Sequence, residues 1–431
     1  MRNRNEFVQL IDRYRLGQAQ RLAIGLSLPN DYRAIHATMT LAEGRGKWLR
    51  PRWFESRQFG LADSISRACR ELATAPANSR LVGDLVQLRA DLTRCLATAI
   101  GDLTALSGNH ARLLMTACVH EPGLWQEDYD GKRAWQPLCE PSLLAELGGV
   151  TIIDALPGRD LAAGGRGWPL FPLAHWLMFA DRSRTISEKP RLLIQLGNFT
   201  ELAWLPESDG LDDELPAIRY QRLWGGALER QIVAACRQFG MDASKRDHLG
   251  AQGKVQTALV RLWQDAGERS DLARHHLAAD MEQELLQQTM EVIQQDKLSL
   301  SDALKSFASY VAQGIRKFLE RRSSRSNLQL VCGGDLANHG LLLSEINMVI
   351  ERPWLDPAEI NFQPEFLRSS TAAIAGLMHI DQMPLTIPWM TGSEMPRVLG
   401  RLTAGSPGNW RRVIMEMGDS RPPVMTLREA I

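Results

Sequence analysis

The sequence predicts an α/β protein built from two related halves, each with a mixed β-sheet flanked by helices. Two apolar runs, residues 21–28 and 191–198, are both typical of a strand that ends in a polar turn. Each run is followed by a returning strand, long helical stretches and a further buried strand. The length of 431 residues also suits two domains better than one. This repeated plan favours two lobes with a ligand crevice between them.

The elements of the first half follow from local patterns. Alternation of apolar and polar residues predicts strands, whereas apolar residues three or four apart, such as Leu85, Leu88 and Leu92, predict helices. In chain order we expect a short helix over residues 4–17, strands over 21–28, 33–44 and 47–56, helical structure over about 61–106, a buried strand over 111–120, a short helix over 140–149 with a glycine C-cap, and a buried strand over 150–157.

The second half repeats the strand, turn and strand before its helices. The apolar stripe that runs from Leu304 through Phe307 and Val311 predicts an amphipathic helix, which we expect Ser301 to cap. In chain order we expect strands over 191–198 and 199–206, helices over about 224–263 and 272–294, the amphipathic helix, and a strand, a double-glycine turn and a helix within 327–350.

Composition excludes several classes of function. Lys plus Arg and Asp plus Glu both number 50, so the net charge gives no electrostatic basis for binding nucleic acid or an anionic membrane. The six cysteines are scattered and contain no CxxC pair, which favours reduced thiols, and the pair His275–His276 lacks a third metal ligand at suitable spacing. No signal peptide or membrane-spanning segment is evident. We therefore expect a cytoplasmic protein without a metal site of its own.

Three glycine-containing turns are candidate phosphate or ligand loops: Gly25–Asn30, Gly164–Gly167 and Gly333–Gly334. Backbone N–H groups that no side chain shields can converge on an anion, especially beside a helix N-terminus. None of the three matches a P-loop or a GxGxxG fingerprint. A tight turn at a domain hinge therefore stays open as the alternative for each.

The central residues resemble the anhydro-N-acetylmuramic acid kinases. The segments VTIIDALPGRDLAAGGRGWPLFPLAHWLMFAD and PRLLIQLGNFTELAWLP carry the resemblance, with Asp160 at the position of the family's acid and Pro169, Leu170 and Pro172 in register. Weaker matches are LGAQGKV, VCGGDLANHGLLL and IPWMTGSEMPRVLG. The resemblance covers roughly residues 20–405.

This resemblance implies a fold and an activity. The fold would be that of the actin, Hsp70 and sugar-kinase superfamily: a two-lobed actin-like ATPase (RNase H-like) fold with duplicated mixed sheets and an interlobe cleft. One lobe would hold residues 1–158 with 379–431, and the other residues 159–378. An active member would use ATP and Mg²⁺ to phosphorylate 1,6-anhydro-N-acetylmuramic acid in cell-wall recycling, and would form a homodimer.

The resemblance also implies site residues. Asp160 would be the base that activates water, which opens the anhydro ring while the sugar accepts the γ-phosphate. The residues expected to bind nucleotide or phosphate are Gly25, Gly164, Gly165, Gly167, Gly197, Gly333 and Gly334. Those expected in the sugar pocket are His120, Trp168 and Thr391.

The sequence departs from the family at several of its functional positions. Pro29 removes a backbone donor from the first loop, and Arg33 and His36 replace its two acids. Asp335 replaces a glycine of the nucleotide loop, and Trp168 replaces an alanine beside the proposed base. In the second half the family's acid is replaced at Gln221, beside Arg222, and a family glutamate is replaced by Ser370. These departures favour a divergent member with weak or absent kinase activity. The alternative is a non-catalytic protein that senses a sugar or nucleotide, or acts through protein association, on the same scaffold.

Overall fold

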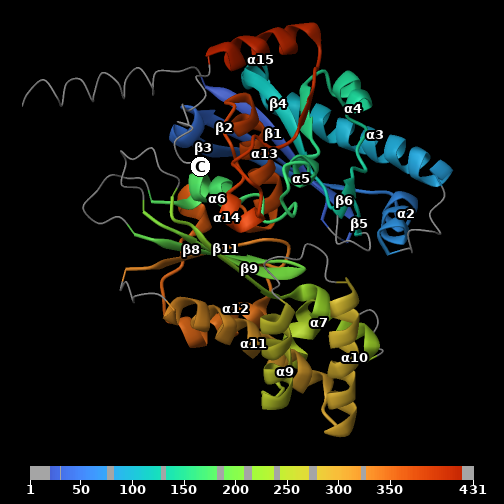
Figure 1. Ribbon diagram of the computed structural model, residues 1–431, viewed down its shortest axis with the longest axis vertical. Helices are drawn as coiled ribbons and strands as arrows, with labels where there is room; N and C mark the ends of the chain where they lie inside the picture. The colour runs from blue at the N-terminus through green and yellow to red at the C-terminus, as the bar shows by residue number, and fades with distance from the viewer. Residues whose placement is uncertain are drawn as a thin grey trace, which may run out of the picture. The chain divides into compact units, whose positions relative to one another are not determined.

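A computed structural model describes residues 20–29, 31–74, 82–127, 133–181, 189–207, 216–236, 243–270, 279–321 and 327–419. The chain forms two compact units (Figure 1). The first unit comprises Met1–Met178 and Ile360–Ile431, and the second comprises Phe179–Glu359. The helix predicted over residues 4–17 and the pair His275–His276 lie outside the described residues.

The first unit contains a six-stranded mixed sheet with the order β12-β7-β4-β1-β2-β3. Its strands are β1 (Arg21–Ser27), β2 (Ala34–Glu43), β3 (Arg50–Gly60), β4 (Leu114–His120), β7 (Thr151–Asp154) and β12 (Arg401–Thr403). The strands β1, β2 and β3 form an antiparallel meander, while β4 runs parallel to β1 and β7 runs parallel to β4. Every residue of β1 is buried, as expected for a strand covered on both faces of the sheet.

Helices cover both faces of this sheet. On one face Leu22 and Ile24 of β1 share a core cluster with Leu92 and Leu96 of α3. On the other face α13 lies so close to β1 that a Cβ atom on Gly25 would be 1.8 Å from the carbonyl oxygen of Ser369. The helices of this unit are α2 (Asp63–Thr74), α3 (Val82–Leu106), α4 (Pro141–Gly148), α5 (Leu156–Leu161), α6 (Pro172–Phe179, whose last residue begins the second unit), α13 (Leu367–Ile380), α14 (Pro388–Thr391) and α15 (Pro407–Asp419), and its hairpin is β5 (Leu124–Glu127) with β6 (Arg133–Gln136).

The second unit repeats the strand order of the first. Its sheet has the order β10-β9-β8-β11, in which β8, β9 and β10 form an antiparallel meander and β11 runs parallel to β8. The strands are β8 (Arg191–Leu196), β9 (Phe199–Leu205), β10 (Arg219–Trp224) and β11 (Gln329–Gly333). This order matches β3-β2-β1-β4 of the first unit. The predicted fold class, two related α/β halves with mixed sheets, is confirmed.

The helices of the second unit are α7 (Gly226–Ala235), α8 (Ala243–Ala251), α9 (Thr257–Ser270), α10 (Ala279–Gln295), α11 (Leu300–Glu320) and α12 (Gly340–Ile350). Figure 1 shows most of them gathered beside the sheet, where their apolar faces form one core with it. Trp263, Phe307 and Tyr310 pack edge to face or tilted at the centre of this core. The hydroxyl of Tyr310 accepts a hydrogen bond from the Trp224 amide at 3.2 Å, which joins α11 to the end of β10.

Several local features differ from the sequence prediction, and three of them lie in the second unit. The strand β10 was not predicted, and the helix expected over 224–263 is divided into α7, α8 and α9. The cap of α11 is Ser299 rather than Ser301, because the Ser299 hydroxyl accepts the Asp302 amide at 3.1 Å and the Asp302 carboxylate accepts the Ser299 amide at 3.2 Å.

The two units also divide at other points than the boundaries expected at residues 158/159 and 378/379. Two contacts explain why the first unit includes α13 and most of α6. The Ser369 hydroxyl of α13 is 2.7 Å from the Thr38 hydroxyl of β2. The Thr371 hydroxyl of α13 is 3.7 Å from the sulfur of Met178 in α6. Among the helices that the structure describes, none is long and apolar enough to cross a membrane.

Candidate functional site

Asp160 lies on the short helix α5, directly after the buried strand β7, and is completely buried. The chain then folds back around this residue. The Asp160 carbonyl accepts hydrogen bonds from the amides of Ala163 and Gly165, at 3.0 and 2.9 Å. Its carboxylate oxygen Oδ2 accepts the amide of Gly167 at 2.7 Å. The carboxylate is therefore enclosed by the turn that follows it.

The glycines of this turn allow that enclosure. Gly164 and Gly167 have φ angles of +78° and +72°, in the left-handed region that side chains disfavour. A Cβ atom on Gly165 would lie 2.1 Å from Oδ2 of Asp160. The structure thus brings Gly164, Gly165 and Gly167 together with Asp160, and they shape the surroundings of the carboxylate.

The charge state of Asp160 is set by opposing effects. Burial raises the pKa of Asp160, while the Gly167 amide, the Thr391 hydroxyl and the charge of Arg166 lower it. Its second oxygen, Oδ1, is buried and receives no hydrogen bond of normal geometry from the described chain, although the Thr391 hydroxyl is near enough to affect the pKa. A buried carboxylate with one oxygen still able to accept a proton is suited to act as a general base.

Thr391, at the end of α14, is held next to the glycine turn. Its carbonyl accepts the Arg166 amide at 2.9 Å, and its hydroxyl is 3.0 Å from the Ser393 hydroxyl. Gly392 follows with a φ of +80°, and a Cβ atom there would lie 3.3 Å from the Arg166 guanidinium. The sequence prediction placed Thr391 and Asp160 in one site, and the structure brings them together.

The β5–β6 hairpin forms an aromatic wall beside the turn, which the sequence analysis missed. Trp125 and Trp135 both donate their indole N–H to the Pro122 carbonyl, at 2.9 and 3.0 Å. A Cβ atom on Gly167 would lie 2.6 Å from the Trp125 ring. The indole ring of Trp125 therefore packs directly on the glycine whose amide binds Asp160.

His120 and Trp168 both contact Phe171. The ring centres of His120 and Phe171 are 4.7 Å apart, and those of Trp168 and Phe171 are 6.5 Å apart, with both pairs edge to face. Burial lowers the pKa of His120 to about 3, with further lowering by Arg368 and His175. His120 is therefore uncharged at neutral pH, and its Nδ1 has no hydrogen-bond partner in the described part of the chain.

His120 belongs to a row of polar side chains across three strand ends. Ser27 of β1 pairs with His36 of β2 on one side and with His120 of β4 on the other. Directly paired residues project from the same face of a sheet, and here that face is the one covered by α13, because the His36 ring is 5.1 Å from Phe366 at the start of this helix. The hydroxyls of Ser27 and of Ser370 in α13 are buried without a partner among the residues described. Unpaired buried groups of this kind can bind the hydroxyls of a polar, uncharged ligand.

Comparisons with known proteins show the family of this chain. Residues 50–405 match the family model "Anhydro-N-acetylmuramic acid kinase". The chain belongs to the anhydro-N-acetylmuramic acid kinase family. It is 26% identical to the anhydro-N-acetylmuramic acid kinase of Chromohalobacter salexigens, over 89% of this chain and all of the relative. It is 27% identical to that of Bordetella petrii, over 79% of this chain and 82% of the relative.

Among solved structures, the chain is similar to the activator of 2-hydroxyisocaproyl-CoA dehydratase from Clostridium difficile with bound ADPNP. That match has 10% identity and a TM-score of 0.37, and covers 83% of this chain and 94% of the other.

Two of the remaining glycines that the family resemblance selected, Gly25 and Gly334, pack closely against backbone in the structure. Gly25 lies inside β1, where the backbone of α13 occupies the space of a side chain. Gly334, with a φ of +102°, follows Gly333 at the end of β11, and its Cβ atom would lie 2.4 Å from the Leu196 carbonyl. Gly197, in the β8–β9 turn, accepts the Gly226 amide at 2.8 Å. Gly197, Gly333 and Gly334 belong to the second unit, and Asp160 to the first.

The turn between β1 and β2, where the family resemblance expects a phosphate loop, uses its amides internally. The Leu28 amide donates to the His120 carbonyl at 3.2 Å, and the Tyr32 amide donates to the Pro29 carbonyl at 2.9 Å. The Arg33 amide donates to the Asp31 carboxylate at 3.1 Å. Pro29 has no amide hydrogen, and Asn30 lies outside the described residues. These four positions of the turn therefore offer no N–H group to a phosphate.

The first amides of α7 in the second unit also donate hydrogen bonds within the protein. The Gly226 and Ala227 amides donate to the carbonyls of Gly197 and Asn198, at 2.8 and 3.1 Å. Just before it, Arg222 is 3.2 Å from the Glu201 carboxylate, with its guanidinium 3.8 Å from the centre of the Phe199 ring. Arg222 thus has a structural role within the sheet, as a buried ion pair stacked on an aromatic ring.

Proposed function

We propose that this protein binds 1,6-anhydro-N-acetylmuramic acid or a closely related amino sugar, and phosphorylates it weakly or not at all. Membership of the family supports the kinase-like function, and the enclosed Asp160 carboxylate supports an intact base. The β1–β2 turn supports weak or absent phosphorylation. Phosphoryl transfer depends on donors that hold and neutralise the phosphates, and the amides of Leu28, Tyr32 and Arg33 already donate within the protein. A cytoplasmic role in recycling cell-wall amino sugars is part of this proposal, since the family resemblance implies it.

The residues of the β1–β2 turn do not fit a nucleotide phosphate. The amides of Leu28, Tyr32 and Arg33 would each have to break a hydrogen bond within the protein before binding it. We therefore derive no phosphoryl-transfer step for this chain.

The residues that remain suit the sugar better than the nucleotide. In the presence of a bound sugar, Oδ1 of Asp160 would accept a proton from a hydroxyl group or a water molecule. The uncharged His120 and the hydroxyls of Ser27 and Ser370 would serve as hydrogen-bond partners for ring hydroxyls. Trp168 would offer an aromatic face for the sugar ring. This set of groups also favours the second candidate function, a sugar-sensing protein without catalysis.

The test is calorimetric titration with 1,6-anhydro-N-acetylmuramic acid and with Mg·ATP, followed by an assay of ADP release with both present. We expect the sugar to bind, and turnover to be far below about 1 s⁻¹, the lower end of ordinary enzyme rates. Turnover of about 1 s⁻¹ or more, abolished by Asp160→Asn, would show a working kinase and contradict the proposal. Absence of sugar binding by a protein with normal circular dichroism would contradict its first half.

A further inference from the structure

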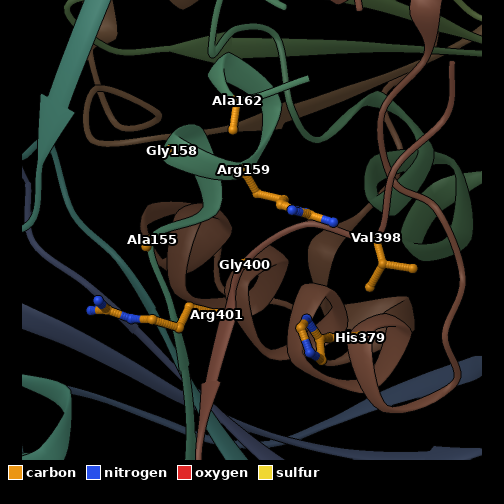
Figure 2. A pocket seen from close by; sticks show the side chains of 8 residues that line it. All are labelled: Ala155, Gly158, Arg159, Ala162, His379, Val398, Gly400 and Arg401. Atoms are coloured by element: carbon orange, nitrogen blue, oxygen red, sulfur yellow. The ribbon is translucent and has the colours of Figure 1, made fainter. Parts of the chain in front are cut away.

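A pocket with a volume of about 480 Å³ is lined in part by residues of α5, the helix that also carries Asp160 (Figure 2). All of its lining residues belong to the first unit. They are Ala155, Gly158, Arg159, Ala162, His379, Val398, Gly400 and Arg401. They come from the α5 turn, from the end of α13, and from the segment that leads into β12.

Arg159 is the residue that gives this pocket its charge. Its side chain is exposed and makes no hydrogen bond or ion pair with any residue that the structure describes. Figure 2 shows it extending from α5 towards Val398. Arg401 extends in another direction and is paired with the buried Asp154 carboxylate, through bonds of 3.0 and 2.6 Å. The lining includes no carboxylate, so the charge of Arg159 is not neutralised within the pocket.

His379 adds a polar group without adding a charge. Its Nδ1 is 2.7 Å from the Leu399 carbonyl, so this nitrogen carries the proton and donates the bond. Burial lowers the pKa of His379, and the nearby charge of Arg159 lowers it further. Both side chains line the pocket. The pocket therefore combines one unpaired cation and a neutral imidazole.

The rest of the wall is apolar or made of close-packed backbone. Ala155, Ala162 and Val398 contribute methyl groups. Gly400 has a φ of +94°, and a Cβ atom there would lie 2.9 Å from the Asp154 carbonyl. This glycine lets the segment before β12 pack directly against the end of β7, and it is part of the pocket lining. A ligand that suits such a pocket has an apolar body and one anionic end.

We propose that this pocket binds a small organic oxyanion, a carboxylate or a phosphate monoester, whose charged end is held by Arg159. The guanidinium presents a planar set of donors that matches both kinds of oxyanion. Because Arg159 and Asp160 are adjacent on α5, such a ligand would bind next to the turn that encloses Asp160. The residues proposed to bind the sugar do not line this pocket, and the proposal does not depend on the proposed function.

Three probes of similar size test the chemistry: phenyl phosphate, benzoate and benzyl alcohol. Binding is measured by isothermal titration calorimetry on the full chain. We expect at least one of the two anions to bind, and benzyl alcohol to bind far more weakly. A preference between the anions then identifies the phosphate or the carboxylate as the natural end group. Failure of both anions to bind at 10 mM, a concentration chosen as about ten times a millimolar Kd, or equal binding of benzyl alcohol, would overturn the proposal.

Two variants place the binding at Arg159. Arg159→Gln should weaken the better anion by about tenfold or more, because a hydrogen bond to a charged group is lost. Ala162→Glu should weaken it as well, since the new carboxylate would compete for Arg159. The matched control is Arg411→Gln, which removes an exposed arginine of the same unit on α15 and should leave the affinity unchanged. Equal effects of Arg159→Gln and Arg411→Gln would mean general charge attraction and overturn the site.

Amide hydrogen exchange locates the bound anion by an independent measurement. The better anion should slow exchange in the α5 turn and around Gly400, and Arg159→Gln should remove this protection. Protection confined to other segments would overturn the proposal even if calorimetry detects binding.

Discussion

The turn after Asp160 shows how single residues define the site. Gly165 is needed because Oδ2 of Asp160 occupies the space of its side chain, 2.1 Å from the position of a Cβ atom. Gly167 is needed because its amide binds the same oxygen and the Trp125 ring covers its α-carbon. Gly165 and Gly167 are therefore explained by an enclosed carboxylate. No bound phosphate is required to account for them.

Gly165→Ala should destabilise the first unit by about 1–3 kcal/mol, the usual cost of inserting a methyl group into a filled site. It should also weaken sugar binding, because the Asp160 carboxylate must move. Urea unfolding and calorimetry measure the two effects. Gly101→Ala is the control: a Cβ atom there meets open space on helix α3, and alanine should stabilise it by up to about 1 kcal/mol. Equal stability of Gly165→Ala and wild type would mean that the turn is not closed around Asp160.

The helix α11 provides a direct test at the scale of an element. Ser299 and Asp302 form a reciprocal capping box at its start, whereas Ser301 already lies inside the helix. Ser299→Ala should lower the free energy of unfolding of the second unit by about 1 kcal/mol, the typical value of an N-cap. Ser301→Ala should change it by a few tenths of a kcal/mol at most. Thermal or urea unfolding of the two variants decides between the caps, and a larger loss for Ser301→Ala would contradict the structure.

The sequence could predict the elements that have a local signal, and it missed those that depend on tertiary pairing. The strands β1, β8 and β11 were predicted correctly, because continuous apolar runs bounded by turns are a local signal. The strand β10 was missed because Arg219, Gln221 and Arg222 interrupt its apolar pattern, and its strand character depends on pairing with β9. The exact cap was missed for a similar reason, since Ser299 and Ser301 both precede the apolar stripe.

The candidate site was predictable only in part. Asp160 and Thr391 were selected through the family resemblance, and the structure places them together. Gly25 was interpreted as a ligand-binding glycine, although its absent side chain makes room for α13, which is distant in the sequence. Ser27 gave no local signal, because its place between His36 and His120 depends on the registers of two strand pairs. Tertiary register is what the single sequence lacks.

At the scale of the whole molecule, buried titratable groups make the stability of the first unit depend on pH in opposite directions. The first unit contains two histidines, His120 and His175, whose pKa burial lowers from 6.5 to about 3. Its Glu121 has a pKa that burial raises from 4.5 to about 7, although its carboxylate accepts the amides of Leu138 and Cys139. These groups make opposite contributions to the pH dependence of stability.

The signs follow from which state binds the proton. Between pH 6.5 and 3 the unfolded chain protonates each of the two histidines while the folded chain does not, so acid lowers the free energy of unfolding. Between pH 4.5 and 7 the folded chain keeps a proton on Glu121 while the unfolded chain releases it, so acid raises the free energy of unfolding over that range. The burial of Asp160 and Asp154 raises the pKa of each and acts in the same direction as Glu121.

His120→Gln isolates one of these contributions, because the variant cannot titrate at this position. Between pH 6 and 4.5 acid should lower the free energy of unfolding of the first unit less steeply in the variant than in the wild type. The two slopes should differ by about 1.4 kcal/mol per pH unit, which corresponds to one proton. Hydrogen exchange of peptides from β1 and β4 reports this unit by itself. Above pH 7.5 the two proteins should show parallel pH profiles, because His120 is then neutral in both the folded and the unfolded chain. Identical slopes below pH 6 would mean that the imidazole of His120 is accessible to protons in the folded state, and that the row formed by His36, Ser27 and His120 is not buried beneath α13.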